Sequence, residues 1–103
     1  MNFNEYQIQA AATAVYQEKA YPVASLMVEA AELADIFVKP YLRGDDTKPD
    51  RDKIISEAGD VLWNLAAILT DCNITLNTVA QYNLDKLEDR RKRNVLMGSG
   101  DNR

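Results

Sequence analysis

Four carboxylates interrupt the two most apolar stretches of this chain. Glu29 and Glu32 lie within residues 26–37, and Glu57 and Asp60 lie within residues 54–69. Each pair is spaced i, i+3, so on a helix both acids of a pair share one face, about a turn apart. Partly buried carboxylates cost several kcal/mol unless their charge is compensated, and two of them about 5 Å apart repel by about 3 kcal/mol at an effective dielectric constant near 20. A bound divalent cation is the simplest compensation.

The residue types of the chain restrict which cation this is. No histidine occurs, which excludes Ser-His-Asp and Cys-His catalysis, the usual Cys/His zinc sites and the Glu-x-x-His sites of di-iron bundles. Carboxylate oxygens suit hard cations, so Mg²⁺ is expected, and Mn²⁺ could replace it. Mg²⁺ keeps ligand positions open for phosphates. Lys86, Arg90 and Arg93 could bind those phosphates if their helix packs nearby, so the residues indicate metal-dependent phosphate chemistry.

Two helices are predicted in the first half of the chain. Residues 4–19 are expected to form a helix with Asn4 as its cap, because residues 10–14 are rich in alanine. A second helix is expected to begin near Pro22, which is well placed in a first turn, and to end or kink at Pro40. Apolar residues recur between these prolines at spacings of three and four, which predicts a buried stripe that contains the first acid pair.

Two further helices are predicted in the second half. Residues 43–52 carry glycine, proline and dense mixed charge, which predicts a loop. A third helix over residues 54–69, capped by Asp50 or Asp52, is apolar on nearly every side and is therefore expected to be the most buried element. A fourth begins at Thr75 or Asn77 and ends in the basic residues 90–93. The predicted fold class is all-α, with four helices in a bundle.

Composition limits the remaining possibilities. A chain of 103 residues with 47% hydrophobic and 27% charged residues is expected to form one domain, here residues 1–97, followed by a flexible tail, residues 98–103. Charges break every apolar segment before the roughly 20 residues that a membrane span needs, and the polar N-terminus does not resemble a secretory signal, so a cytoplasmic location is expected. The net charge of −4 argues against a stable nucleic-acid complex.

The acid pattern resembles that of a known family. Glu29-x-x-Glu32 followed by Glu57-x-x-Asp60 is similar to the Glu-x-x-Glu and Glu-x-x-Asp signature of MazG-like nucleoside triphosphate pyrophosphohydrolases. Residues 28–33 and 57–63 resemble the family's second-helix and third-helix segments, and residues 83–87 with Arg90 resemble its later Asn-x-x-Lys element. The resemblance spans nearly the whole chain, whose short length and ending look like those of the compact members found in phages and mobile elements.

This resemblance implies a MazG-like, oligomeric all-α fold. The implied activity is hydrolysis of (deoxy)nucleoside triphosphates to the monophosphate and pyrophosphate, in control or house-cleaning of the nucleotide pool. It also implies that family members work as a homodimer or a homotetramer. The residues carried over are the Mg²⁺ ligands Glu29, Glu32, Glu57 and Asp60 and the phosphate contacts Asn83, Lys86 and Arg90.

Several roles stay open at the level of sequence. Trp63 is either a stacking partner for the nucleobase or a core residue. Asn64 either hydrogen-bonds a metal-bound water or the sugar, or makes a polar contact at the surface or at an interface. Glu29 or Glu32 could also serve as general base. The alternative function is a non-catalytic helical module for nucleotide binding or oligomerisation, and a third reading is a helical regulator whose basic residues 90–93 bind nucleic acid.

Overall fold

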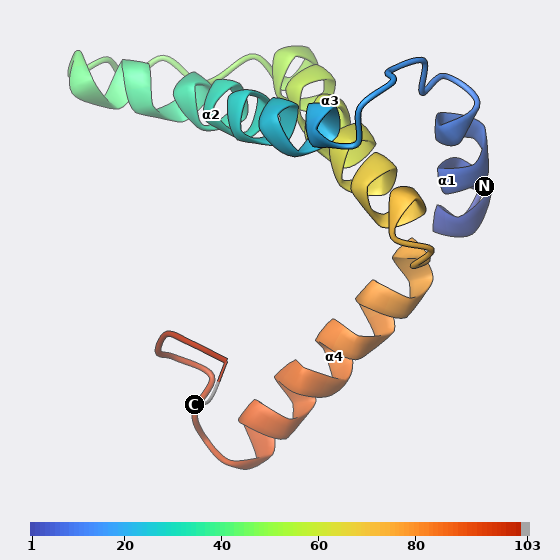
Figure 1. Ribbon diagram of the computed structural model, residues 1–103. Coiled ribbons are helices and arrows are strands. Elements are labelled where there is room, and N and C mark those ends of the chain that lie inside the picture. Colours follow the sequence, from blue (N-terminus) through green and yellow to red (C-terminus); the bar gives the residue numbers. More distant parts are fainter. Residues whose placement is uncertain (102–103) are drawn as a thin grey trace.

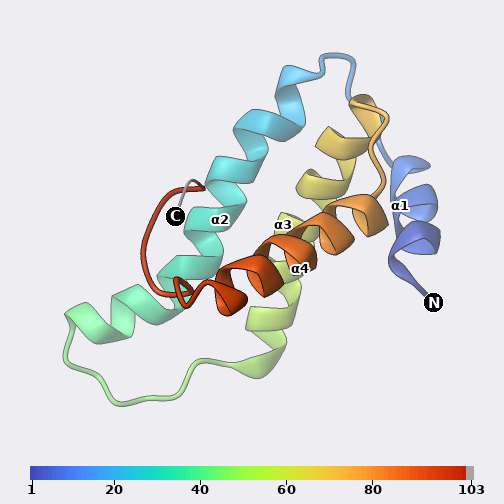
Figure 2. The ribbon, with the colours of Figure 1, turned by 90° about the horizontal axis from the view of Figure 1, so that it is seen from below.

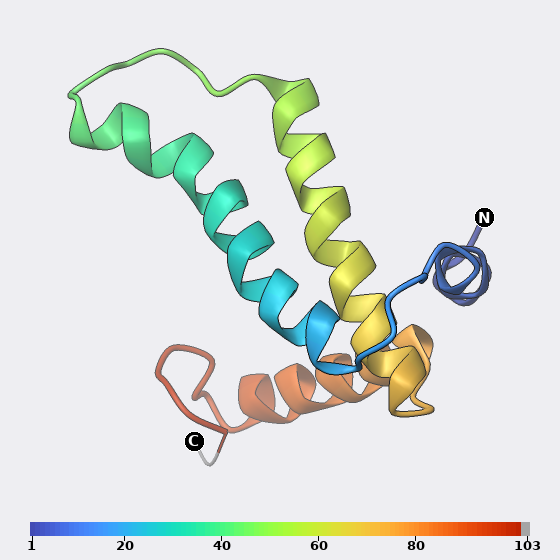
Figure 3. The same cartoon turned by 45° about the horizontal axis from the view of Figure 1, so that its top comes forward.

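The computed structural model describes residues 1–101, which fold into four helices: α1 (Phe3–Ala11), α2 (Ala20–Leu42), α3 (Arg51–Asp71) and α4 (Leu76–Lys92) (Figure 1). This part of the chain contains no strand, so the predicted all-α class with four helices is confirmed. α2 and α3 pack against each other as a long hairpin closed by the loop before Arg51 (Figure 3). None of the helices in residues 1–101 combines the length and the apolarity that a membrane span requires.

The prediction for α1 is wrong at both ends. Asn2, not Asn4, is the cap, because the Asn2 side chain accepts a hydrogen bond of 2.9 Å from the backbone N–H of Glu5. At the other end Thr13 bonds the carbonyl of Ala10 through its backbone N–H at 3.0 Å and through its hydroxyl at 2.7 Å. These bonds tighten the chain into a turn instead of continuing the i, i+4 pattern. The alanine propensity is therefore overridden after Ala11.

The two prolines of α2 are both compatible with its helical course. The helix begins at Ala20 and places Pro22 in the first turn, where an N–H group has no partner within the helix. Pro40 lies in the last turn, and the helix continues past it to Leu42. The expected beginning near Pro22 is confirmed, and the end lies two residues beyond the expected one.

α3 is the central helix. Asp50 caps it by accepting a hydrogen bond of 3.0 Å from the N–H of Asp52, and α3 packs against both α1 and α2. Its buried residues, Asn64, Ala66 and Ala67, confirm that it is the most buried element. Thr75 caps α4 through a bond of 3.1 Å from the N–H of Thr78. Both caps are among the residues predicted for them.

α4 gives the molecule an open shape. This helix packs against α1 and leads away from the α2–α3 hairpin (Figure 1); in the view from below it only passes in front of α3 (Figure 2). The radius of gyration is 16.5 Å, whereas a compact domain of this length has about 13 Å. A single copy therefore leaves one side of the hairpin uncovered by α4.

Gln7 connects α1 to the turn between α3 and α4. Its side chain is 8% exposed. The amide nitrogen donates to the Thr70 hydroxyl at 3.2 Å and to the Ile74 carbonyl at 2.9 Å, and the amide oxygen accepts from the Leu76 N–H at 2.8 Å. One buried amide thus satisfies two backbone groups next to the start of α4. This contact sets the direction in which α4 leaves α3.

We expect Gln7→Ala to lower the free energy of unfolding by about 2–3 kcal/mol, because it leaves buried backbone groups without partners. Urea denaturation followed by circular dichroism measures the loss. Gln9→Ala is the matched control, since Gln9 is an exposed glutamine of the same helix, and it should change stability by less than about 0.5 kcal/mol. Equal effects of the two substitutions would contradict the role given to Gln7.

The division of the chain at residue 97 remains a prediction. Residues 98–101 follow α4 and fold back beside it (Figure 1). The flexible tail predicted for residues 98–103 includes Asn102 and Arg103, which lie outside the described residues.

Candidate active site

Packing of α2 against α3 brings three of the four predicted acids together. Glu29 of α2 and Glu57 and Asp60 of α3 each offer a carboxylate oxygen, and these oxygens lie within 4.8 Å of one another. The i, i+3 spacing puts Glu57 and Asp60 on the same side of α3, toward α2. Two helices are therefore enough to assemble the acid cluster that the sequence predicts.

Glu32 lies beside this trio. It lines a cavity of about 230 Å³ between α2 and α3, together with Glu57. Its negative charge contributes to raising the pKa of both Glu29 and Glu57. All four predicted acids thus meet at one place on the hairpin, although Glu32 stands outside the set whose oxygens converge.

The electrostatics of the cluster are unfavourable without a cation. Burial raises the pKa of Glu29, and the neighbouring charges of Glu32 and Asp60 raise it further. Burial and then the charges of the same two residues also raise the pKa of Glu57, while Lys53 opposes the shift. The nearby groups that perturb these acids most are other carboxylates.

Two oxygens of the cluster have no hydrogen-bond partner in the part of the chain that the structure describes. Glu29 Oε2 and Glu57 Oε2 are buried, and neither has a hydrogen-bond partner among residues 1–101. Within the same range none of the four acids forms an ion pair with lysine or arginine. This argues against a purely structural role of Glu57 and Asp60 as partners in salt bridges. Unpaired buried carboxylate oxygens are the donor set that suits Mg²⁺ or Mn²⁺, so the residues fit the expected metal.

Two lysines at the cavity were not among the predicted site residues. Lys39 and Lys53 line the same cavity as Glu32 and Glu57. Lys39 forms an ion pair of 3.0 Å with Asp35, whereas the charge of Lys53 lowers the pKa of Glu57. The sequence does carry a signal for Lys53, because it precedes Glu57 by four residues and so shares its helix face.

Trp63 belongs to an aromatic cavity next to the acid cluster. This cavity of about 680 Å³ is also lined by Tyr16 and Tyr21. The Trp63 and Tyr16 rings meet edge to face, with centroids 6.2 Å apart, and Tyr16 stacks on Tyr21 at 5.7 Å. Trp63 Nε1 donates to the Thr13 hydroxyl at 2.8 Å. Since Trp63 follows Asp60 by three residues, the cavity and the acids share one side of α3.

Asn64 is buried in the protein interior. It is 3% exposed, and its Nδ2 donates to the backbone carbonyl of Asp60 at 2.9 Å. The alternative of a contact at the protein surface is therefore wrong, because α3 is the central helix. Asn64 Oδ1 is buried without a hydrogen-bond partner among the described residues. A contact from this residue to the substrate stays a prediction.

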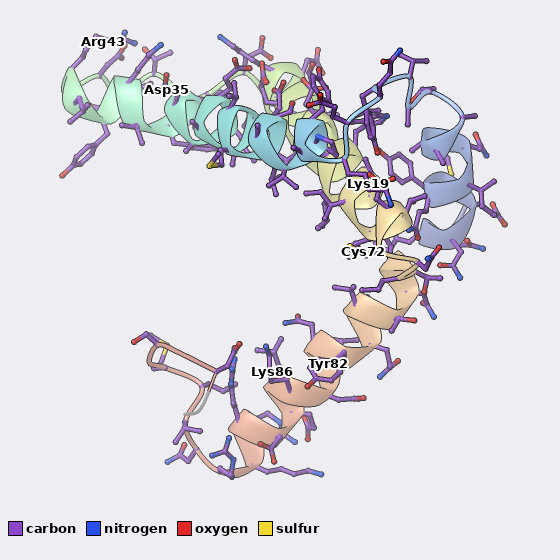
Figure 4. All side chains as sticks on the ribbon, in the orientation of Figure 1. Lys19, Asp35, Arg43, Cys72, Tyr82 and Lys86 are labelled. Atoms are coloured by element: carbon purple, nitrogen blue, oxygen red, sulfur yellow. The ribbon has the colours of Figure 1, made fainter. Side chains whose placement is uncertain are left out.

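The predicted phosphate contacts form a second cluster, on α4. Asn83 and Lys86 line one cavity of about 320 Å³, and Arg90 follows one turn later on the same face. α4 is packed against α1 and not alongside the hairpin, and Figure 4 shows Lys86 well apart from Asp35 of α2. One copy of the chain therefore assembles the acids and the phosphate contacts separately. Arg93, the further basic residue considered, donates to Asp89 at 2.9 Å.

The comparisons with known proteins show the family of this chain. The MazG nucleotide pyrophosphohydrolase domain matches residues 17–95, which contain both acid pairs and the α4 cluster. The chain is also similar to the "Gene 37 protein" of Mycobacterium phage L5, with 39% identity over 115 residues and full coverage of both chains. No solved structure matches it. This chain belongs to the family of MazG nucleotide pyrophosphohydrolase domains.

Proposed function

We propose that this protein hydrolyses (deoxy)nucleoside triphosphates to the monophosphate and pyrophosphate in a Mg²⁺-dependent reaction. The observation that carries the proposal is the convergence of carboxylate oxygens of Glu29, Glu57 and Asp60 within 4.8 Å. Two buried oxygens of this cluster lack a hydrogen-bond partner among residues 1–101. Family membership supports the reaction class. Together they favour an active enzyme over a helical module that only binds nucleotides or oligomerises.

In this proposal the four acids hold the metal and position the attacking water. When bound there, Mg²⁺, or Mn²⁺ in its place, would neutralise phosphate charge and orient water. We assign Glu32 the additional role of general base, because it lines the cavity beside Glu57 and, outside the converging trio, is the acid least engaged by the metal. A carboxylate in this position can accept the proton of a water molecule that the other acids orient.

The aromatic cavity is the proposed site of the nucleobase. Its walls include Trp63, Tyr16 and Tyr21, and aromatic faces stack on any base. Trp63 lies about one helical turn after Asp60 on α3. A nucleotide whose base stacks on the Trp63 ring can therefore extend its phosphates toward the acids. Replacement of Trp63 by Ala should raise KM for the preferred nucleotide more than it lowers kcat, and an unchanged KM would contradict this placement.

A homodimer or homotetramer is proposed as the working form. The open chain exposes large apolar side chains on α2 and α4: Met27 is 70% exposed, Tyr82 71% and Leu84 60%. A second copy that covers the hairpin could bring its own α4, with Lys86 and Arg90, toward the acids. Sedimentation velocity should give a multiple of 11.6 kDa. A monomer at all concentrations with full activity would contradict this assembly.

A product-resolved assay tests the proposed function. Each of the canonical NTPs and dNTPs is incubated with the full chain and Mg²⁺, and the products are separated by ion-exchange chromatography. The proposal predicts nucleoside monophosphate and pyrophosphate in equal amounts. Orthophosphate as the product, or binding without turnover of any nucleotide, would overturn it, and the second result would favour the non-catalytic alternative.

A further inference from the structure

The basic cluster on α4 already binds an anion that belongs to the chain itself. Asp101 Oδ1 accepts a hydrogen bond from Lys86 Nζ at 3.0 Å and another from an Arg90 terminal nitrogen at 3.1 Å. One carboxylate oxygen thus bridges the two cations assigned to the substrate phosphates. The same two cations hold the pKa of the Asp101 carboxyl below its usual range.

Arg90 is unusually buried for an arginine. Its side chain is 6% exposed, whereas that of Asp101 is 81% exposed, and Arg90 Nε is buried without a partner among the described residues. A buried guanidinium with donors to spare is a strong site for an oxyanion. The exposed carboxylate of Asp101 is therefore the exchangeable member of this contact, and a phosphate group offers more acceptor oxygens to the same donors.

The backbone of the tail is shaped for this contact. Gly98 has φ 143° and Gly100 has φ 84°, a region that glycine adopts without strain and other residues rarely do. These two glycines turn the chain back after Val95, whose N–H bonds the Arg90 carbonyl at 2.9 Å. A Cβ at Gly100 would meet no atom within 4 Å, so alanine fits there sterically and differs from glycine in the backbone conformation that it adopts without strain.

From these contacts we infer that the C-terminal tail is an internal competitor of the substrate: Asp101 occupies the Lys86–Arg90 pair and must leave before a triphosphate binds there. The inference rests on the proposed function, in which these two side chains bind substrate phosphates. A site that is free for only part of the time binds its ligand more weakly, in proportion to the free fraction. The tail thus raises the triphosphate concentration at which the enzyme becomes occupied.

A titration with inorganic tripolyphosphate tests the inference. The full chain, labelled with ¹⁵N and kept free of metal with EDTA, is followed by NMR at the amides of Gly98 and Gly100, since the sequence has only four glycines. Asp101→Asn is expected to lower the Kd of tripolyphosphate by about threefold to tenfold. In the wild-type chain the ligand should shift both tail amides toward the positions that they have in free Asp101→Asn.

Matched variants separate the tail contact from general effects of charge and strain. Asp46→Asn removes the same charge in the exposed loop after α2 and should leave the Kd within about twofold. Gly100→Ala should lower the Kd as Asp101→Asn does, because alanine is strained at φ 84°. Gly44→Ala, with φ 64° in the same loop as Asp46, carries a similar strain and should not lower it.

Equal Kd values for Asp101→Asn and Asp46→Asn, or tail amides that do not move at saturating tripolyphosphate, would overturn the inference. The titration contains no nucleotide and no Mg²⁺. Displacement of the tail can therefore be detected or excluded even in a chain that has no pyrophosphohydrolase activity. Failure of the tail contact and failure of the proposed function are thus distinguishable.

Discussion

Glu57→Gln is expected to lower kcat/KM for the preferred nucleoside triphosphate by about a thousandfold, which corresponds to about 4 kcal/mol of transition-state stabilisation. Glutamine keeps the size of the side chain and a carbonyl oxygen, but it removes one negative charge from the trio that converges within 4.8 Å. A site with fewer charged ligands binds Mg²⁺ more weakly. The loss is measured as initial rates of pyrophosphate release at several Mg²⁺ concentrations.

The control for this substitution is Glu5→Gln, which makes the same change on an exposed residue at the start of α1. It should keep kcat/KM within about twofold, since the contacts of the Glu5 side chain are local, with Asn2 and the N-terminal amine, and do not involve the acid cluster. Thermal melts show whether Glu57→Gln remains folded. A folded Glu57→Gln variant with wild-type kcat/KM would contradict the role of the acids in the reaction.

Mg²⁺ is expected to raise the Tm of the protein strongly. It is also expected to reverse the fall of stability with rising pH that the acids cause in its absence. At about ten times its Kd, a ligand that binds only the folded state raises Tm by about 6–10 °C in a domain of this size. The same Mg²⁺ concentration should raise the Tm of Glu57→Gln at least about threefold less, because this variant binds the ion more weakly. Scanning calorimetry at pH 7.5 with and without Mg²⁺ measures it.

The sign of the pH effect follows from the raised pKa values of Glu29 and Glu57, whose ordinary value is 4.5. A pKa that is higher in the folded state contributes stability below the unfolded value, and this contribution is lost as the pH rises through the folded value. In EDTA, therefore, Glu57→Gln should gain Tm relative to the wild type as the pH rises from 4 to 7. If the difference in Tm between Glu57→Gln and the wild type is constant over this pH range, the acids do not repel one another in the folded protein.

Much of the fold follows from local sequence signals. Asp50 and Thr75 act as caps because their short polar side chains can reach the first free N–H groups of a helix, and this chemistry is visible in the sequence. The acid cluster could also be predicted from a local pattern. The i, i+3 spacing puts both acids of a pair on one helix face, and the apolar residues around them indicate that this face packs against a neighbouring helix.

Other features depend on contacts that no local pattern encodes. α1 ends at Ala11 because Thr13 bonds Ala10, a choice that competes with high alanine propensity. Gln7 bonds residues that are more than 60 positions away, and a glutamine on a short helix gives no sign of this. The sequence makes Lys86 a neighbour of the acids only if α4 packs nearby, and the direction of α4 is set by such long-range contacts.

The central claim is that Glu29, Glu32, Glu57 and Asp60 together hold a divalent cation, and Mn²⁺ binding tests it most directly. Electron paramagnetic resonance of free Mn²⁺, titrated with the wild-type chain, with Glu57→Gln and with Glu5→Gln, gives the affinity without any requirement for turnover. We predict that the wild type and Glu5→Gln bind Mn²⁺ with equal affinity, that Mg²⁺ displaces it, and that Glu57→Gln binds at least about tenfold more weakly. Equal affinity of all three proteins for Mn²⁺ would contradict the account.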